Sequence, residues 1–199
     1  MKKVSIFLIT TLIVISCGLG KKKQANAENE KDVLRGIYTV IDDAGFVELP
    51  YKTYYGQKGA IFIESNLKTL YGIGWIYGVL PDTSLFYGIL FDNGVSETPF
   101  LTTFDKRGNL IISDMLGEEN SWEKGMVGEI ILCEEYTIVN KDLTLHYYFN
   151  SKHLYEGNSG EYDVLICENF EKRGKINTAG KIIFEEKMKI VDDCENNVD

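Results

Sequence analysis

Short runs of β-forming residues, each closed by a cluster of turn residues, recur along this chain from residue 36 onward. The runs are rich in Ile, Val, Tyr, Phe and Thr, and the turn clusters come about every ten residues. Such spacing is typical of antiparallel sheets, in which tight turns join consecutive strands. The sequence therefore predicts an all-β fold of one domain, arranged as an antiparallel meander, sandwich or barrel with at most short helical turns.

Three turn clusters mark the expected strand boundaries in the first half of the chain. They are Asp-Asp-Ala-Gly at 42–45, between strands at 37–41 and 46–49; Asp-Asn-Gly at 92–94, after a strand at 85–91; and Asp-Lys-Arg-Gly-Asn at 105–109, between strands at 100–104 and 110–113. Later strands are expected at 129–139, 143–149, 162–170 and 181–190. Only residues 65–70 and 118–124 indicate a turn or two of helix. The segment 104–110 recurs in similar form at 170–176, which two similar hairpin turns would explain.

The N-terminal segment follows a different pattern. Lys2 and Lys3 precede an uncharged, mostly apolar run over residues 4–15. A positive start, a short apolar segment and small residues before a cleavage site describe a secretory signal. The run is also short for a transmembrane helix, which needs ~20 apolar residues. Export is therefore expected.

Residues 14–17, Val-Ile-Ser-Cys, resemble the lipobox of bacterial lipoproteins. The resemblance implies that diacylglycerol is attached to the thiol of Cys17, that cleavage occurs just before it, and that Cys17 begins the mature chain. Gly18 stands where inner-membrane lipoproteins of enterobacteria carry aspartate, so the resemblance favours an outer-membrane anchor facing the periplasm if the source is Gram-negative. The hairpin at 104–112 is faintly similar to turns in small Gram-negative β-sheet lipoproteins, which implies no catalytic residues.

These observations divide the chain into four segments. They are a signal peptide at 1–16, a lipidated tether at 17–32, a β-sheet domain at 33–191 and an acidic tail at 192–199. The tether has almost no apolar content and would span roughly 20 Å root-mean-square as a flexible chain. Its lysines at 21–23 would either attract an anionic membrane surface or serve solubility alone.

The net charge argues against nucleic acid as a partner. The chain carries −9, which becomes −11 once Lys2 and Lys3 leave with the signal. A phosphate-binding surface needs clustered Lys and Arg, whereas the basic residues here are scattered or lie in the tether.

Three cysteines follow Cys17 in the sequence. Cys133 and Cys167 lie in expected strands, and Cys194 lies in the acidic tail. If the strand at 143–149 lies between the first two, their separation is about two strand spacings, ~9.6 Å, beyond the ~7 Å Cα limit for a disulfide. We therefore expect two ordinary strand cysteines in place of a bridge.

No catalytic residue and no metal or cofactor site is predicted. The only histidines are His146, expected to be half-exposed on a strand, and His153, expected in a loop; with six residues between them, they match no common zinc spacing. Adjacent carboxylates such as Glu134 and Glu135 point to opposite faces of a strand, so they cannot act together as acid and base on one substrate. The other adjacent pairs are 42–43, 118–119, 185–186 and 192–193.

The stretch 71–79 combines aromatic residues with glycines. As a strand it would place Tyr71, Trp75 and Tyr77 on one face and its glycines on the other. We expect these rings to be buried as a core face. The alternative is an aromatic, glycine-lined surface that binds a ligand, for which these three residues are the candidates.

The sequence thus favours a non-catalytic, membrane-anchored cell-envelope lipoprotein that binds a partner protein or a small ligand through its β domain. The alternatives are a hydrolase acting on glycans, and an inhibitor or immunity-like protein. A hydrolase would need two carboxylates brought together from different strands.

Overall fold

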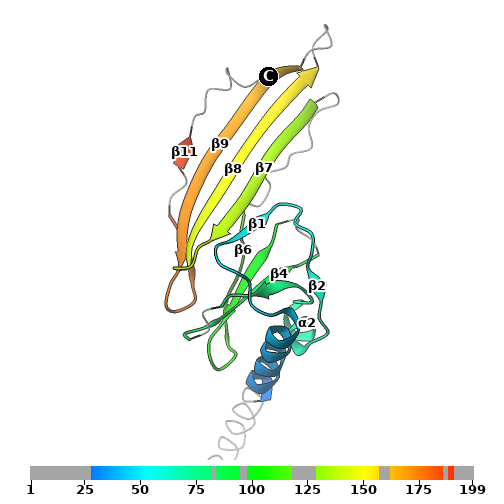
Figure 1. Ribbon diagram of the computed structural model, residues 1–199, viewed down its shortest axis with the longest axis vertical. Helices are drawn as coiled ribbons and strands as arrows, with labels where there is room; N and C mark the ends of the chain where they lie inside the picture. The colour runs from blue at the N-terminus through cyan, green and yellow to red at the C-terminus, as the bar shows by residue number, and fades with distance from the viewer. Residues whose placement is uncertain are drawn as a thin grey trace, which may run out of the picture.

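The protein is elongated, with a wide body at one end and a narrow arm of long strands at the other (Figure 1). The computed structural model describes residues 28–81, 84–94, 98–117, 129–156, 162–185 and 188–190. Within this part of the chain most residues belong to antiparallel strands arranged in two sheets. The predicted all-β class is confirmed.

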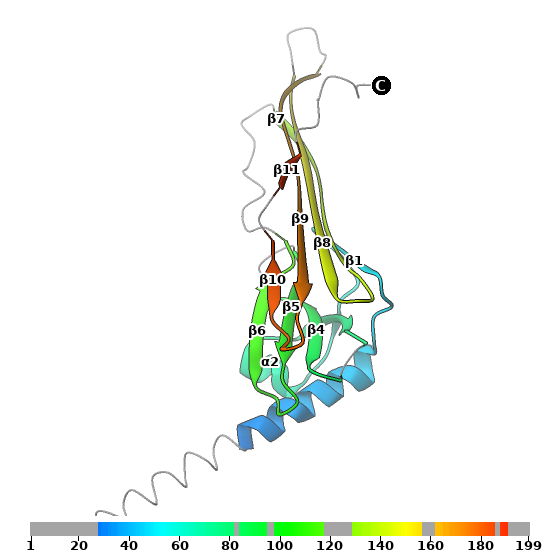
Figure 2. The same cartoon turned by 90° about the vertical axis from the view of Figure 1, so that its left-hand side faces the viewer.

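A helix over residues 28–44 lies at the base of the body (Figure 2), where the sequence predicts the end of the tether and a strand at 37–41. Val33, Ile37 and Val40 recur at helical spacing, and each is almost completely buried. Gly45 ends the helix with φ of 72°, and its N–H donates to the carbonyl of Ile41. The strand prediction at 37–41 was therefore wrong, because four of these five residues are β-branched and favour strands locally, although the segment is part of an amphipathic helix.

One sheet is a meander of five consecutive strands, β2 to β6. Its strands are β2 (Ile61–Phe62), β3 (Trp75–Val79), β4 (Tyr87–Asp92), β5 (Phe100–Phe104) and β6 (Leu110–Met115). A short helix, α2 (Asn66–Tyr71), joins β2 to β3 and confirms the helical turns expected near 65–70. The segment 46–49 forms only a single bridge, between Phe46 and Val79.

The turn between β5 and β6 has the structure expected from its residues. The Oδ1 atom of Asp105 accepts hydrogen bonds from the N–H groups of Arg107 and Asn109, and Gly108 has φ of 89°. Burial tends to raise the pKa of Asp105, but hydrogen bonds from Asn109 and Arg107 outweigh it and lower the pKa. The predicted hairpin is confirmed.

The second sheet has six strands in the order β1-β7-β8-β9-β10, with β11 also paired to β9. Its strands are β1 (Tyr51–Tyr54), β7 (Glu129–Val139), β8 (Thr144–Glu156), β9 (Tyr162–Ile176), β10 (Ile182–Phe184) and β11 (Met188–Ile190). Strand β7 has its predicted bounds. Residues 170–176 continue strand β9, so the recurrence of the 104–110 sequence there does not mark a second turn.

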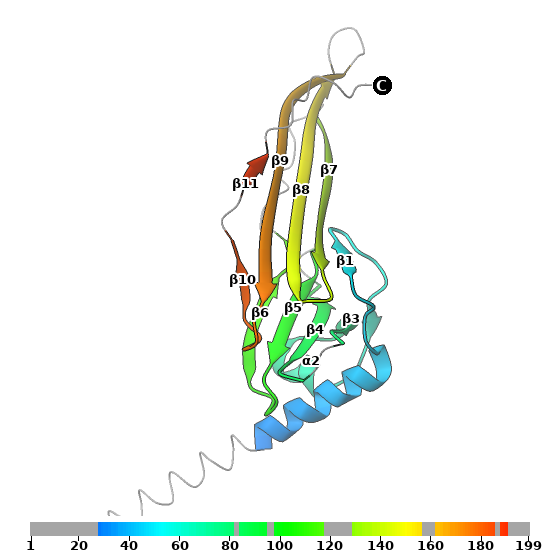
Figure 3. The same cartoon turned by 60° about the vertical axis from the view of Figure 1, so that its left-hand side comes forward.

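Helix, five-stranded sheet and six-stranded sheet form three layers (Figures 2 and 3). Between the helices and the first sheet lies a core that includes Ile37, Leu67 and Ile89. Between the two sheets lies another, which includes Leu90, Leu101 and Leu145. Strand β4 supplies neighbouring residues to both cores and is buried on both faces, which explains its uninterrupted apolar sequence.

The arm consists of the upper parts of β7, β8 and β9, which continue past the body (Figure 1). Strand β8 lies between the other two, with Ser151 opposite Cys133 and Lys152 opposite Cys167. The two cysteines are therefore on non-adjacent strands, as expected, at a separation too large for a disulfide.

Candidate functional site

The three aromatic residues proposed as ligand contacts do not form one surface. Tyr71 is the last residue of α2, not part of a strand, and its ring packs edge-to-face on Phe104 at 5.4 Å between centroids. Gly72 caps the helix with φ of 74°, so strand alternation begins only at Trp75. The register then shifts between Ile76 and Gly78, which breaks the predicted alternation.

Tyr77 holds the loop that connects β1 to β2. Its hydroxyl donates to the carbonyl of Gln57 at 2.8 Å, and the Gln57 side chain donates to the Tyr51 hydroxyl at 2.7 Å. Burial, followed by the negative charge of Asp92 and the proximity of Tyr51, raises the pKa of Tyr77 to about 12. Its contacts are those of a residue that fixes a loop.

Trp75 is exposed, contrary to the expectation of a buried ring. Half of its surface (50%) is accessible to solvent, whereas its neighbour Ile76 is completely buried. Strand β3 has only the two-residue β2 on one side, so the indole lies near the edge of the sheet. The completely buried apolar residues of this strand are Ile76, one position after Trp75, and Val79.

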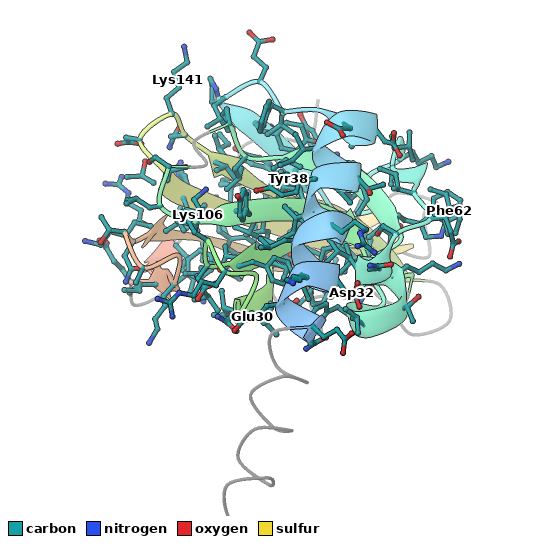
Figure 4. All side chains as sticks on the ribbon, turned by 90° about the horizontal axis from the view of Figure 1, so that it is seen from below. Glu30, Asp32, Tyr38, Phe62, Lys106 and Lys141 are labelled. Atoms are coloured by element: carbon teal, nitrogen blue, oxygen red, sulfur yellow. The ribbon has the colours of Figure 1, made fainter. Side chains whose placement is uncertain are left out.

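Phe62 is the partner of Trp75. The two residues stand opposite each other on β2 and β3, and their rings meet edge-to-face with centroids 5.2 Å apart. Phe62 is 47% exposed, and Ile61 beside it is exposed to a similar extent. We call Ile61, Phe62 and Trp75 the edge patch; Figure 4 shows Phe62 at the periphery of the molecule.

Charged groups flank the edge patch on both sides. Nζ of Lys68 lies 4.5 Å from the centroid of the Phe62 ring and 2.8 Å from Oε2 of Glu64. Asp92 on β4 is the cross-strand neighbour of Trp75, and its carboxylate accepts a hydrogen bond from the N–H of Gly94. The patch therefore combines an apolar surface with one carboxylate next to the indole.

A second group of aromatic side chains, exposed at Tyr54 and half-buried at Tyr136 and Tyr148, packs against its own neighbours. Tyr54, Tyr136 and Tyr148 stand in register across β1, β7 and β8, and the last two rings are stacked at 4.9 Å. Nζ of Lys52 lies 3.4 Å from the centroid of Tyr136 and 3.8 Å from Glu134. Because the lysine covers a ring face and two other faces meet each other, this ladder stabilises the sheet and offers less surface to a ligand.

The adjacent glutamates behave as the strand geometry predicts. Glu134 is exposed beside Lys52, whereas Glu135 is buried and accepts a hydrogen bond from the Tyr147 hydroxyl at 3.1 Å. Their side chains point to opposite faces of β7, which confirms that they cannot act as a pair.

The histidines both lie on β8. His146 is half-buried, as predicted, with Nε2 3.1 Å from Oε2 of Glu171, although the angle does not suit a hydrogen bond. His153, expected in a loop, is a strand residue paired with Ile131 and Ile166. Within the described ranges, no three His, Cys, Asp or Glu side chains gather as ligands for a metal ion.

Several residues singled out in the sequence lie outside the described part of the chain. They are Cys17, the glutamates at 118–119, Asp192, Asp193 and Cys194. No helix in the described segments has the length and apolar character needed to cross a membrane.

Phe62 was missed because its role depends on pairing register. The run 60–63 is apolar throughout, so neither a helical nor an alternating period distinguishes the exposed Phe62 from the buried Ile63. No protein-family model matches the sequence, and no curated protein or solved structure matches it either.

Proposed function

We propose that this protein is a cell-envelope lipoprotein, anchored through Cys17, whose β domain binds a partner protein or a small ligand without catalysing a reaction. If the source is Gram-negative, its place is the outer membrane, facing the periplasm. The signal pattern and the Val-Ile-Ser-Cys sequence support the anchor. The exposed Phe62–Trp75 pair supports the binding role.

The edge patch is the best-supported binding surface for three reasons. Trp and Phe are enriched at interfaces, where a large rigid ring is buried at low entropic cost. Gln57, held by Tyr51 and Tyr77, fixes the loop that leads into the patch, so the surface is preformed. Asp92 next to the indole favours a partner that presents a cationic group beside an apolar one.

In-cell photocrosslinking tests this role. A photoreactive residue replaces Phe62 in one strain and Ile183, which is equally exposed on β10, in a matched control strain. We expect a discrete adduct from position 62 that disappears when Trp75→Ala is added, and none from position 183. Equal crosslinking from both positions, or an adduct unaffected by Trp75→Ala, would show that the edge patch is not the binding surface.

The same strains distinguish the other two functional classes. An inhibitor or immunity-like protein would give an adduct whose partner is a lytic enzyme or toxin. A glycan hydrolase would release reducing sugars from isolated envelope glycans. The Trp75→Ala variant alone would not show which carboxylates carry out that reaction. We expect no such release.

A further inference from the structure

The anchor limits how the domain can stand on a membrane. Residue 28, where the described helix begins, lies eleven positions after Cys17. Even fully extended, this stretch of chain spans no more than ~40 Å. Strand β9 alone has 15 residues, and at about 3.3 Å per residue it is ~50 Å long. The residue-28 end of the helix lies at the opposite end of the molecule from the arm (Figures 1 and 3). The anchor therefore holds the base of the body, and not the arm tip, close to the bilayer.

The base of the body carries exposed apolar and aromatic side chains beside a lysine. Tyr38 on the helix is 51% exposed and Leu85, just before β4, is 53% exposed. The Tyr38 hydroxyl lies 3.2 Å from that of Tyr87, and Nζ of Lys106 lies 3.7 Å from the Tyr87 ring centroid and 3.4 Å from the carbonyl oxygen of Phe86. We call Tyr38, Leu85 and Lys106 the basal patch. Figure 4, a view from below, shows Tyr38 and Lys106 on this side.

We infer that the basal patch contacts the bilayer into which the Cys17 lipid is inserted, so that the domain stands upright with its arm pointing away from the membrane. This inference rests on the proposed lipid anchor. It assigns a lipid surface as the occupant of the basal patch and leaves the edge patch open to a partner.

The chemistry of the basal patch suits a membrane interface. A tyrosine places its ring among acyl chains and its hydroxyl among headgroups, and a lysine reaches lipid phosphates with its ammonium group. Glu30 and Asp32 also lie on the side seen in Figure 4, although Asp32 is 3.5 Å from Arg35. Because these carboxylates oppose attraction to anionic lipid, contact depends on the apolar side chains and on the anchor, which holds the patch at high effective concentration.

Fluorescence quenching by a nickel-chelating lipid tests the orientation. The full lipidated chain carries one fluorophore, attached through a noncanonical residue, either at Arg107 in the turn next to the basal patch or at Lys152 on the arm. Each protein is inserted into vesicles of phosphatidylethanolamine and phosphatidylglycerol that contain a small fraction of the nickel lipid. We expect several-fold stronger quenching at position 107 than at position 152. Equal quenching would mean that the domain lies on its side or tumbles, and would overturn the inference.

Two variants test the patch itself. Leu85→Asp, and separately Lys106→Glu, should weaken quenching at position 107, whereas Ile183→Asp, a matched change on exposed β10, should not. Melting curves establish that each variant is folded. If folded Leu85→Asp and Lys106→Glu leave quenching unchanged, the patch does not contact lipid.

Intact mass, measured before the quenching experiment, distinguishes failure of the anchor from failure of the orientation. A chain without the acyl group refutes the anchor, whereas an acylated chain with equal quenching at the two positions refutes only the orientation.

Discussion

Trp75 and Phe62 face each other across β2 and β3, edge-to-face at 5.2 Å, and about half of each side chain remains exposed. A pair of this kind contributes ~0.5–1.5 kcal/mol beyond its buried area. The pair therefore contributes little to the stability of the domain, and it presents a large apolar surface to a partner.

Trp75→Ala should cost the domain little stability. We expect a loss of ~0.5–1.5 kcal/mol from the ring pair, or a few degrees in melting temperature. Ile76→Ala, one residue along the strand and completely buried, should cost ~2–5 kcal/mol. Urea unfolding of both variants measures the contrast. A loss at Trp75 as large as that at Ile76 would mean that the indole is part of the core.

The helix at the base should be essential to the fold. Ile37 is completely buried in the core between the helices and the first sheet, so Ile37→Ala should cost ~2–5 kcal/mol. Arg35→Ala, two residues earlier on the exposed face, should change stability by no more than ~0.5 kcal/mol. Thermal melting of the two variants tests this. Equal stability of the two variants would contradict the burial of Ile37 against the first sheet.

Two glycines of the aromatic stretch should respond differently to a methyl group. At Gly78, φ is 154° and a Cβ would lie 2.6 Å from Cγ1 of Val47, so we expect Gly78→Ala to cost ~1–3 kcal/mol or more. At Gly74, the nearest atom is Cγ of the flexible Lys68 side chain at 3.3 Å, and the loss should be below ~1 kcal/mol. Chemical denaturation measures both. Equal effects would contradict the close approach of Val47 to β3.

Stability should fall as the pH rises from about 10 to about 12. The pKa of Tyr77 is raised to about 12, chiefly by burial, so the folded state keeps a proton that the unfolded chain releases near pH 10. This contribution is fully present below pH 10 and is lost as the pH approaches 12. Tyr77→Phe should reduce the slope of unfolding free energy against pH over this interval. An unchanged slope would show that other tyrosines account for it; Tyr87, with its pKa also raised to about 12, is the main one.

The sequence predicted the fold well where local signals and tertiary pairing agree. Turn residues such as Asp105 and Gly108 located the β5–β6 hairpin, and strand alternation correctly predicted that His146 would be half-exposed on β8. The helix at 28–44 was missed because Ile37, Val40 and Ile41 favour strands locally, while their burial against Leu67 and the sheet requires a helix.

The candidate site was only partly predictable. Trp75 was identified by the aromatic and glycine residues around it in the stretch 71–79. Its place on the sheet depends on the short strand β2 and on the bulge after Ile76, neither of which leaves a periodic signal in the sequence. Its partner Phe62 lies in a short apolar run whose register is set by pairing with β3. Asp92 joins the site for the same reason, as a cross-strand neighbour 17 residues away in the sequence.

Intact-mass spectrometry of the protein purified from membranes is the most direct test of the anchor on which both proposals depend. We predict a chain that begins at Cys17 and carries a diacylglyceryl group on its sulfur, and we predict that Cys17→Ser abolishes this addition. A chain of unmodified mass, cleaved at another position and released from the membrane, would contradict the account.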